Sequence, residues 1–546
     1  MGFTGAVLSK ISSQLSPAPP FSIPVPSKGE KYALLFALGM FATVLVVLGI
    51  LPGERLVALA SHLSKDGQLA PASLRILRAM PFVSLPIGVG TWILLAWHRQ
   101  AARGLYGLFG LLLRPSPATF LCSILCGAAL LRLAWIIWIR SLPVSDFREY
   151  HELTLRLLET GRYLNPDGRP TAFRPPGYPV LLALTYAIAG KTLWAPKIVN
   201  VALGSGTVLL TYVLARRTCG EACARLSALL VAIFPSQVGY TSLLCTEIPF
   251  SFFLLVSIWA VAKIGESTNR RTWNSAALLG LLFGATAMMR PQIALFPVAT
   301  FLVQWRQKGW RRAFAVHLRL VLAMVLPILV WGTRNIKAVG GFVPFSTNAG
   351  VNFYYGNNPW TNGTGLEFSG QLTDQTLSAK SELERSRLGW RLGLEFWRKH
   401  PGRIPELAFR KIAMMMVSDG TWTHWAFGAT ASPLPSAARP FVVVVGNLMY
   451  WPILVLFGLE VLVFRWRRTA RAAANPYLDL CLLYTLLTTA FWLGQERYHF
   501  PLVPILSISA ATVLGRIAVL AAPSEDTRHT GDQPEQTERP MVGGHD

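Results

Sequence analysis

Charged residues are scarce in this chain of 546 residues, because Asp, Glu, Lys and Arg together make up only 14% of it while 52% is hydrophobic. The mean hydropathy is +0.42. A soluble domain carries about 25% charged residues, with which it covers its surface. The shortage therefore excludes an ordinary water-exposed surface. The long apolar runs that stand in its place predict an all-α polytopic membrane protein.

Negatively charged residues are scarcer than positively charged ones. The chain has 27 Asp and Glu and 51 Lys and Arg, which gives a net charge of +24. In a soluble protein this excess would suggest nucleic acid as a partner. Here the basic residues collect in short loops between apolar runs, as they do on the cytoplasmic side of membrane proteins. We therefore expect the lipid bilayer, and no nucleic acid, as a partner. The same asymmetry predicts that both termini are cytoplasmic.

Cysteine is rare as well, and the six cysteines lie mostly within or beside apolar runs, so no disulfide framework is expected. None of the nine histidines is paired at the close spacing of a metal motif such as H-x-x-x-H. We therefore predict no metal site and no required cofactor. A divalent cation remains an open alternative.

Apolar runs of about 20 residues, the length that crosses a bilayer, are what the chain has in abundance. We predict about twelve spans, at 32–52, 79–97, 118–139, 197–215, 224–241, 248–264, 273–289, 291–305, 316–333, 440–464, 477–493 and 500–520. The shorter run 178–189 is nearer in length to a re-entrant or interfacial segment. Leaving it at the outer surface keeps the basic loops on the cytoplasmic side.

This pattern divides the chain into six segments. Two of these segments contain the larger outer regions, which are polar loops on an apolar scaffold. The predicted segments are a proline-rich cytoplasmic tail (1–31), an additional two-span segment (32–117), a catalytic transmembrane core (118–333) with a first outer loop (140–196), an outer periplasmic region with amphipathic helices (334–440), C-terminal spans (441–520) and a disordered cytoplasmic tail (521–546). Chemistry at a membrane surface would take place in the outer loops.

The first outer loop carries an ordered set of polar and aromatic residues. Asp146 is followed by Tyr150, then by Gly161-x-Tyr163, and then by the run RPPGYP at 174–179. This order resembles the first extracytoplasmic loop of GT-C glycosyltransferases. Further motifs follow in the order found in the bacterial protein O-mannosyltransferase and lipid A aminoarabinose transferase group: TE at 246–247, MRP at 289–291, WGTRN at 331–335, GNNP at 356–359 and QERYHFP at 495–501. The resemblance extends from about residue 118 to 520.

The resemblance implies a GT-C fold and a glycosyltransferase at the outer, periplasmic face of the inner membrane. Such an enzyme takes one hexose or pentose from a polyprenyl-phosphate-sugar donor and transfers it, with inversion, to lipid A, a glycan or a protein. Two other classes stay open: an O-antigen ligase or polymerase, and a polyprenyl-lipid or sugar transporter. The early loop Asp followed by RPPGYP favours the GT-C enzyme over the first. Charges at the outer ends of spans, not in their middles, favour it over the second.

Two carboxylates are candidate catalytic residues, because the transfer needs a base for the proton of the acceptor. Asp146 lies a few residues past the outer end of a span, and its alternative role is to cap the helix predicted at 147–160. Glu247 lies at the outer entrance of a span, where it would bind the acceptor or a metal. Its alternative role is an ion pair with an arginine. The neighbouring Glu149 and Glu152 are expected mostly to face solvent.

Arginines recur at the outer ends of the predicted spans, where a lipid-linked phosphate would need cationic ligands. Guanidinium groups bind phosphate oxygens in bidentate fashion and keep their charge in a poorly hydrated pocket. The alternative is that they snorkel to lipid headgroups. The candidate substrate-binding residues are Arg174, Tyr178, Arg290, Arg334, Asn352, Asn357, Arg497 and Tyr498.

The predicted orientation can be tested at the first outer loop. A cysteine introduced as Asp167→Cys is expected to react with an impermeant thiol reagent in intact cells whose outer membrane has been permeabilised, because the loop would face the periplasm. Labelling is measured against the parent protein. If the introduced thiol reacts only after the inner membrane is lysed, the orientation is wrong.

Overall fold

The computed structural model describes residues 27–63, 84–85, 88–93, 95–266, 272–364, 381–430, 436–465 and 475–519. In these ranges the chain is helical, and its β-pairing consists of two isolated bridges, Ser141 with Thr430 and Leu164 with Pro170. The predicted all-α class is confirmed. The predicted tails, 1–31 and 521–546, lie outside the described residues except for 27–31.

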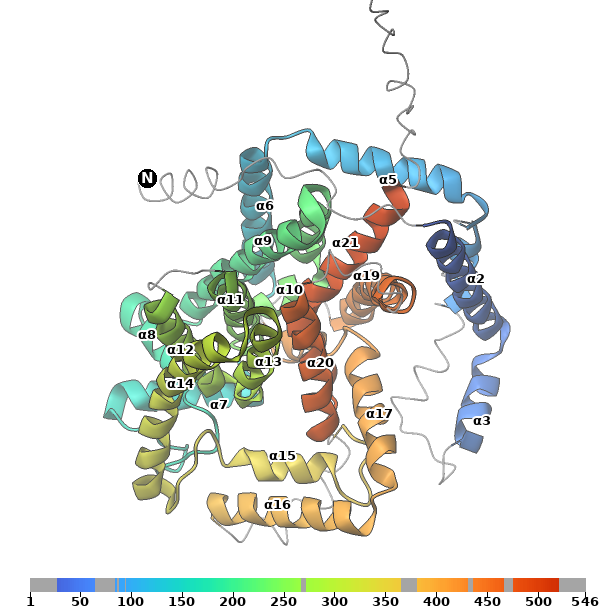
Figure 1. The fold of residues 1–546 in the computed structure, drawn as a ribbon. Coiled ribbons are helices and arrows are strands. Elements are labelled where there is room, and N and C mark those ends of the chain that lie inside the picture. Colours follow the sequence, from blue (N-terminus) through green and yellow to red (C-terminus); the bar gives the residue numbers. More distant parts are fainter. Residues whose placement is uncertain are drawn as a thin grey trace, which may run out of the picture. The chain divides into compact units, whose positions relative to one another are not determined.

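The helices form two compact units, whose described residues lie within 111–514 for one and within 25–110 and 515–519 for the other. Figure 1 labels most of the helices along the chain. They are α2 (Lys28–Ile50), α3 (Gly53–Leu63), α5 (His98–Leu113), α6 (Pro117–Trp138), α7 (Asp146–Thr160), α8 (Gly177–Ala189), α9 (Trp194–Ile233), α10 (Pro235–Gly239), η1 (Tyr240–Ser242), α11 (Glu247–Glu266), α12 (Thr272–Met289), η2 (Pro291–Ile293), α13 (Phe296–Lys308), α14 (Trp310–Val339), α15 (Asn348–Gly356), α16 (Glu382–Lys399), α17 (Arg403–Met416), α18 (Trp422–Gly428), η3 (Ser436–Ala438), α19 (Arg439–Leu459), η4 (Glu460–Arg465), α20 (Pro476–Phe491), η6 (Glu496–Leu502) and α21 (Val503–Val519).

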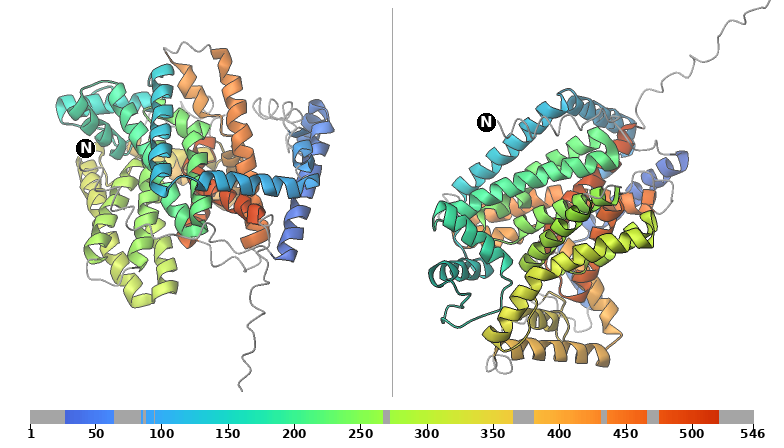
Figure 2. Two further views of the ribbon diagram at one scale, coloured as in Figure 1. Left: turned by 90° about the horizontal axis from the view of Figure 1, so that it is seen from above. Right: turned by 60° about the vertical axis from the view of Figure 1, so that its left-hand side comes forward.

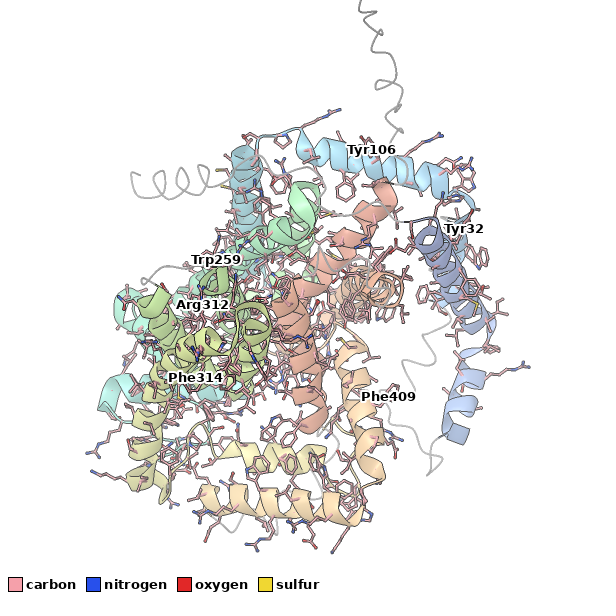
Figure 3. All side chains as sticks on the ribbon, viewed as in Figure 1. Tyr32, Tyr106, Trp259, Arg312, Phe314 and Phe409 are labelled. Carbon is pink, nitrogen blue, oxygen red and sulfur yellow. The ribbon has the colours of Figure 1, made fainter. Side chains whose placement is uncertain are left out.

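Seven helical stretches among the described residues are long and apolar enough to cross a membrane. They are Gly29–Ile50, Pro117–Trp138, Trp194–Ile233, Glu247–Gly265, Trp310–Val339, Arg439–Phe464 and Glu496–Val519. Three more apolar helices are shorter: Gly177–Ala189, Asn274–Met289 and Pro476–Phe491. Large apolar side chains on these helices are exposed, for example Phe314 on α14 (Figure 3), as expected where lipid replaces water. The polytopic character is supported, and the count of twelve spans stays a prediction.

Two predicted spans, 197–215 and 224–241, share one helical element. Within α9 the backbone kinks at Gly220, whose φ of 88° is readily available only to glycine. The next residue, Glu221, is buried and forms ion pairs with Arg216 at 2.8 Å and Arg225 at 2.6 Å. Basic residues expected in a short loop between the two spans therefore lie on a kinked helix, where Arg216 and Arg225 pair with Glu221.

The predicted helix 147–160 is confirmed as α7, which packs against the short helix α8 (Figures 1 and 2). Helix α7 ends at Gly161, which adopts a left-handed conformation with φ of 66°. Its apolar side chains recur at helical spacing and are buried, and the Tyr150 ring meets the Tyr178 ring of α8 edge-on at 5.2 Å. Helix α8 has 13 residues and therefore rises only about 20 Å, less than the apolar thickness of a bilayer.

The amphipathic helices expected within 334–440 include α16 and α17, which are separated at His400 and Pro401. Helix α15 lies alongside α16 (Figure 1), and glycines permit their close approach. A Cβ atom at Gly350 would lie 1.9 Å from the carbonyl oxygen of Ser386. Any side chain there would force the two helices apart.

A core of buried aromatic and aliphatic side chains joins parts of the chain that are far apart in sequence. Tyr150 and Tyr178 of the first outer loop pack there with Ile248 of α11, Trp422 of α18 and Phe500 of η6. This core brings the beginnings of α7 and α11 and the segment η6 to one place. The charged side chains that these segments carry meet beside it.

Candidate active site

Asp146 occupies the first turn of α7, at the end of the outer segment that follows α6. The preceding Ser145 is the one non-glycine residue with positive φ (50°) in the described ranges, and it makes no side-chain cap. The Asp146 carboxylate turns to arginines instead of capping the helix. The local backbone therefore presents this carboxylate to the rest of the site.

Two arginines hold Asp146, one on each carboxylate oxygen. Arg174 donates from Nη2 to Oδ1 at 2.7 Å, and Arg497 donates from Nη1 to Oδ2 at 3.0 Å. Arg174 comes from the RPPGYP run before α8, and Arg497 comes from η6 near the end of the chain. The three side chains are 14%, 18% and 24% exposed for Arg174, Arg497 and Asp146. The structure thus unites two of the sequence motifs at one partly buried carboxylate.

Two further contacts complete the arginine environment. Arg174 donates from Nε to Glu149 Oε2 at 2.6 Å, so one guanidinium bridges two carboxylates on α7. Arg497 lies over the Trp425 ring at 5.4 Å, a distance suited to a cation–π contact. Glu149 is three residues after Asp146, a spacing that puts both on one face of a helix. That spacing was the signal by which Glu149 could have been found from sequence.

The arginines set the protonation state of Asp146. Burial by itself disfavours the charged carboxylate, but the charges of Arg174 and Arg497 and their hydrogen bonds outweigh it and lower the pKa of Asp146 to about 2. Asp146 is therefore an ionised carboxylate at any physiological pH. A carboxylate with so low a pKa is a weak proton acceptor.

A second carboxylate–arginine pair lies at the start of α11. Arg290, between α12 and η2, forms an ion pair with Glu247 and donates from Nε to Thr246 Oγ1 at 2.8 Å. Only 1% of the Glu247 side chain is exposed. Ion pairing with an arginine was one of the two roles considered for Glu247, and the structure has this pair. It also unites the TE and MRP motifs.

Tyr150 connects the two carboxylate–arginine pairs. Its burial raises the pKa of its hydroxyl to about 12, and the charges of Arg174, Asp146, Glu247 and Arg290 all act on it. Tyr150 is therefore a neutral hydroxyl between two charged pairs. Tyr178, next to it, is 1% exposed, and its hydroxyl has no hydrogen-bond partner among the described residues.

A small pocket lies beside Arg290. Its walls come from α11, η2, α13, α20 and η6, and they are largely apolar. The polar groups at its edge include Arg290 and Tyr498, whose ring also lies 5.8 Å from the Arg497 guanidinium. A cavity with an apolar wall and a cationic edge suits an amphiphile that carries an anionic group.

Three predicted site residues lie in other surroundings. The guanidinium of Arg334 donates to the carbonyl oxygens of Thr171 and Tyr163, so it holds the outer loop. Asn357 is buried, and its side chain donates to backbone carbonyls and accepts from Trp397. Asn352 lies on α15. The described contacts of Arg334 and Asn357 are within the protein, and substrate binding by these three residues stays a prediction.

Polar residues that the sequence analysis did not single out support this arrangement. His499, two residues after Arg497, lies 3.0 Å from Asp419 Oδ1 and 2.8 Å from the Met415 carbonyl oxygen, and it stacks on Tyr450. Its contacts anchor η6 to the end of α17. No residue-level pattern in the sequence pairs Asp419 with His499, which are 80 positions apart.

Metal-binding side chains do not cluster in the described ranges, where no group of three His, Cys, Asp or Glu residues is placed to hold an ion. Asp146 and Glu247 instead face guanidinium groups.

Comparison with known proteins supports the resemblance seen in the sequence. Residues 173–331 match the family described as Dolichyl-phosphate-mannose-protein mannosyltransferase. An undecaprenyl phosphate-alpha-4-amino-4-deoxy-L-arabinose arabinosyl transferase of Pseudomonas aeruginosa is 30% identical over 201 residues, which cover 34% of this chain and 35% of the relative. These similarities support a GT-C glycosyltransferase of the protein-mannosyltransferase and aminoarabinose-transferase type.

Other similarities are more distant or shorter. An uncharacterized protein of Aquifex aeolicus is 30% identical over 124 residues, covering 22% of this chain and 24% of that protein. ArnT from Cupriavidus metallidurans bound to undecaprenyl phosphate has a TM-score of 0.37 and 14% identity, covering 74% of this chain and 78% of that one. The Archaeoglobus fulgidus oligosaccharyltransferase in the apo form has a TM-score of 0.45 and 14% identity, covering 72% and 50%. TM-scores below 0.5 do not by themselves establish the fold.

The match to the arabinosyl transferases is partial, since the chain spans about a third of the length of these relatives. The segment that matches the mannosyltransferase family includes Arg174, Tyr178, Glu247 and Arg290. Asp146 and Arg497 lie outside that segment. Their place in the site therefore rests on the contacts described above.

The loop that carries Arg174 is held by a carboxylate from α16. Glu382 accepts a hydrogen bond from the Thr171 hydroxyl at 2.9 Å and one from the Ala172 backbone amide at 2.7 Å. Tyr163 in turn donates its hydroxyl to the Arg174 carbonyl oxygen at 3.2 Å. These contacts fix the backbone on which the guanidinium is mounted.

Glu382→Ala is therefore expected to loosen the loop. Loss of a charged acceptor for the buried Ala172 amide should speed hydrogen exchange there roughly tenfold or more, because such a bond contributes about 1.5–3 kcal/mol. Hydrogen–deuterium exchange with peptide resolution measures it. Glu395→Ala is the matched control on the same helix, since Glu395 pairs only with Lys399 at the surface. Equal exchange in both variants would contradict a role for Glu382.

Proposed function

We propose that this protein is a membrane glycosyltransferase that moves a single sugar from a polyprenyl-phosphate-linked donor to an acceptor at the outer face of the inner membrane. The observation that carries the proposal is the Asp146 carboxylate between Arg174 and Arg497, at the end of an outer loop. A base and two phosphate ligands within contact of one another are the groups that such a transfer requires.

The donor would bind with its phosphate at the arginines and its prenyl chain in the neighbouring cavity. Arg174 and Arg497 offer planar forks suited to phosphate oxygens. Arg290 and Tyr498 line the neighbouring pocket, whose apolar wall would contact the isoprene units nearest the phosphate. This arrangement leaves the anomeric carbon of the sugar near Asp146.

The chemistry follows from these positions. An acceptor hydroxyl oxygen forms a bond to the anomeric carbon while the bond from that carbon to the phosphate oxygen breaks, and the electron pair departs with the phosphate. Asp146 accepts the hydroxyl proton. Attack opposite to the leaving phosphate inverts the anomeric configuration. Since a phosphate leaves readily, no acid has to protonate it, and the arginines stabilise its growing charge.

The sugar and the acceptor follow from the relatives only by analogy. The matched relatives are named as arabinosyl transferases, which favours a pentose. Lipid A, a glycan and a protein are the candidate acceptors. Mass spectrometry of lipid A, surface polysaccharide and periplasmic proteins from a host that lacks the chain would identify which one loses a sugar.

The proposed topology has about twelve spans, with both termini in the cytoplasm and the site in the periplasm. The distribution of basic loops supports this orientation. The matches to transferases favour the proposed function over the O-antigen ligase or polymerase and the transporter alternatives. The proposed reaction requires no cofactor, although a divalent cation could assist it.

Asp146→Asn is expected to lower transfer at least about a hundredfold, because the amide keeps the size of the side chain but cannot accept the proton. Release of undecaprenyl phosphate from an undecaprenyl-phosphate-linked sugar by purified protein measures it. Glu152→Gln is the control on the same helix, since Glu152 pairs with exposed Arg148 and not with the site. Normal turnover by Asp146→Asn would remove this carboxylate from the mechanism.

Arg174→Ala and Arg497→Ala are each expected to raise the KM for the donor roughly tenfold to a hundredfold, because each removes a charge-assisted contact of about 1.5–3 kcal/mol. Lys at either position should restore the loss only in part, since a point charge does not reproduce the fork. The KM for the acceptor should change little. Arg148→Ala, which removes an exposed guanidinium from α7, is the control. If the KM for the donor is unchanged in both variants, these arginines do not bind the donor phosphate, and the alternative that they contact lipid headgroups is favoured.

A further inference from the structure

The arginines that the proposed donor site would use are already paired with carboxylates. Arg174 contacts Asp146 and Glu149, Arg497 contacts Asp146, and Arg290 contacts Glu247. Three guanidinium groups thus face three carboxylates. A donor phosphodiester, which carries one negative charge, would enter a site whose positive charges are already balanced.

Carboxylate and phosphate compete for the same hydrogen-bond donors in this site. Asp146 takes one terminal nitrogen from each of Arg174 and Arg497, and these are the groups that a bridging phosphate would use. A phosphate cannot lie between the two guanidiniums while the carboxylate lies there. One anion must replace the other.

We propose that the donor phosphate displaces Asp146 from Arg174 and Arg497, and that Asp146 is released to act as the base only when the donor is bound. This inference rests on the proposed function. In this proposal Arg174 and Arg497 are not an empty phosphate site. They are paired with a carboxylate at rest and exchange it for the donor phosphate. The exchange also orders the reaction, since the acceptor can be deprotonated only after the donor has entered.

The exchange resolves a conflict in the resting geometry. With both oxygens accepting from guanidinium groups, Asp146 has no oxygen free of an arginine and little affinity for a proton. When the phosphate takes those donors, the burial of Asp146 remains while the opposing charges are shared with another anion. Its affinity for a proton then rises toward the range in which a general base is effective.

The site has the freedom that the exchange requires. Glu149 is 44% exposed, so it can turn toward water when Arg174 moves. The backbone of Arg174 is held by the Tyr163 hydroxyl, and Arg497 Nε is held by Gln495 Oε1 at 2.8 Å. Only the terminal guanidinium nitrogens have to change partner. A short side-chain motion therefore suffices.

The same competition would help the product leave. After transfer, Asp146 carries the proton and the polyprenyl phosphate carries the negative charge on the arginines. When Asp146 loses that proton to water, its carboxylate competes again for Arg174 and Arg497. The carboxylate therefore weakens the binding of any polyprenyl phosphate, which can be measured without turnover.

Binding of undecaprenyl phosphate to the purified full chain in detergent tests the exchange. Asp146→Asn removes the competing charge and is expected to bind the lipid about fivefold to fiftyfold more tightly than the unaltered protein, although it does not catalyse transfer. Glu149→Gln removes the second partner of Arg174 and should tighten binding by a smaller factor. Glu152→Gln removes the same charge from α7 outside the site and should leave binding unchanged.

Unchanged or weaker binding by a folded Asp146→Asn would overturn the exchange. If Asp146→Asn fails to fold, the Glu149→Gln variant provides the test. If Glu149→Gln binds undecaprenyl phosphate no more tightly than Glu152→Gln does, the exchange is overturned as well. Failure of the unaltered protein and of all variants to bind undecaprenyl phosphate would instead overturn the proposed function, and with it the exchange. If Glu152→Gln tightens the binding of undecaprenyl phosphate as much as Asp146→Asn does, the tighter binding comes from the change in net charge. That result would contradict the exchange.

Discussion

The contact on which the site depends is the Asp146 carboxylate held between the guanidinium groups of Arg174 and Arg497. It joins the first outer loop to η6, across 351 positions of sequence. Charged groups that leave water lose solvation energy, and they recover it only through close partners with suitable geometry. At this site each charge is the partner of another, so the position of any one of them depends on the others.

Neutral polar and apolar contacts keep these charges in place. Tyr163 and Glu382 hold the loop that carries Arg174, while His499 holds η6 through Asp419 and Met415. The aromatic core around Tyr150 packs beneath the charged groups. These contacts orient the backbone, and the Arg174 and Arg497 side chains keep a small exposed fraction.

A balanced site of this kind has consequences for selectivity. An anion gains little by approaching arginines whose charge is already neutralised, unless it can replace their carboxylate partners. The neighbouring apolar cavity adds affinity for a ligand with a hydrocarbon chain, so a lipid-linked phosphate has an advantage over inorganic phosphate. In the proposed reaction, binding of the lipid-linked phosphate would be coupled to release of the base.

The sequence by itself determined the class of the protein, because hydrophobic runs and the scarcity of charge follow directly from composition. It also determined helix α7, and it singled out Asp146 and Arg174 as candidate site residues because they lie in one short loop whose motifs have a recognisable order. Local periodicity and motif order are properties of neighbouring residues. Both properties can therefore be read from the sequence without knowledge of the fold.

Only the tertiary structure decided which charges meet. Arg497 pairs with Asp146, and Arg290 pairs with Glu247, through contacts between residues remote in sequence. Arg334 and Asn357 likewise have partners in other segments, such as the carbonyl oxygens of Tyr163 and Phe491, which their residue types alone did not reveal. The residue type arginine does not reveal whether the side chain binds a phosphate or pairs with a carboxylate of the protein, because tertiary packing determines which partner lies beside it.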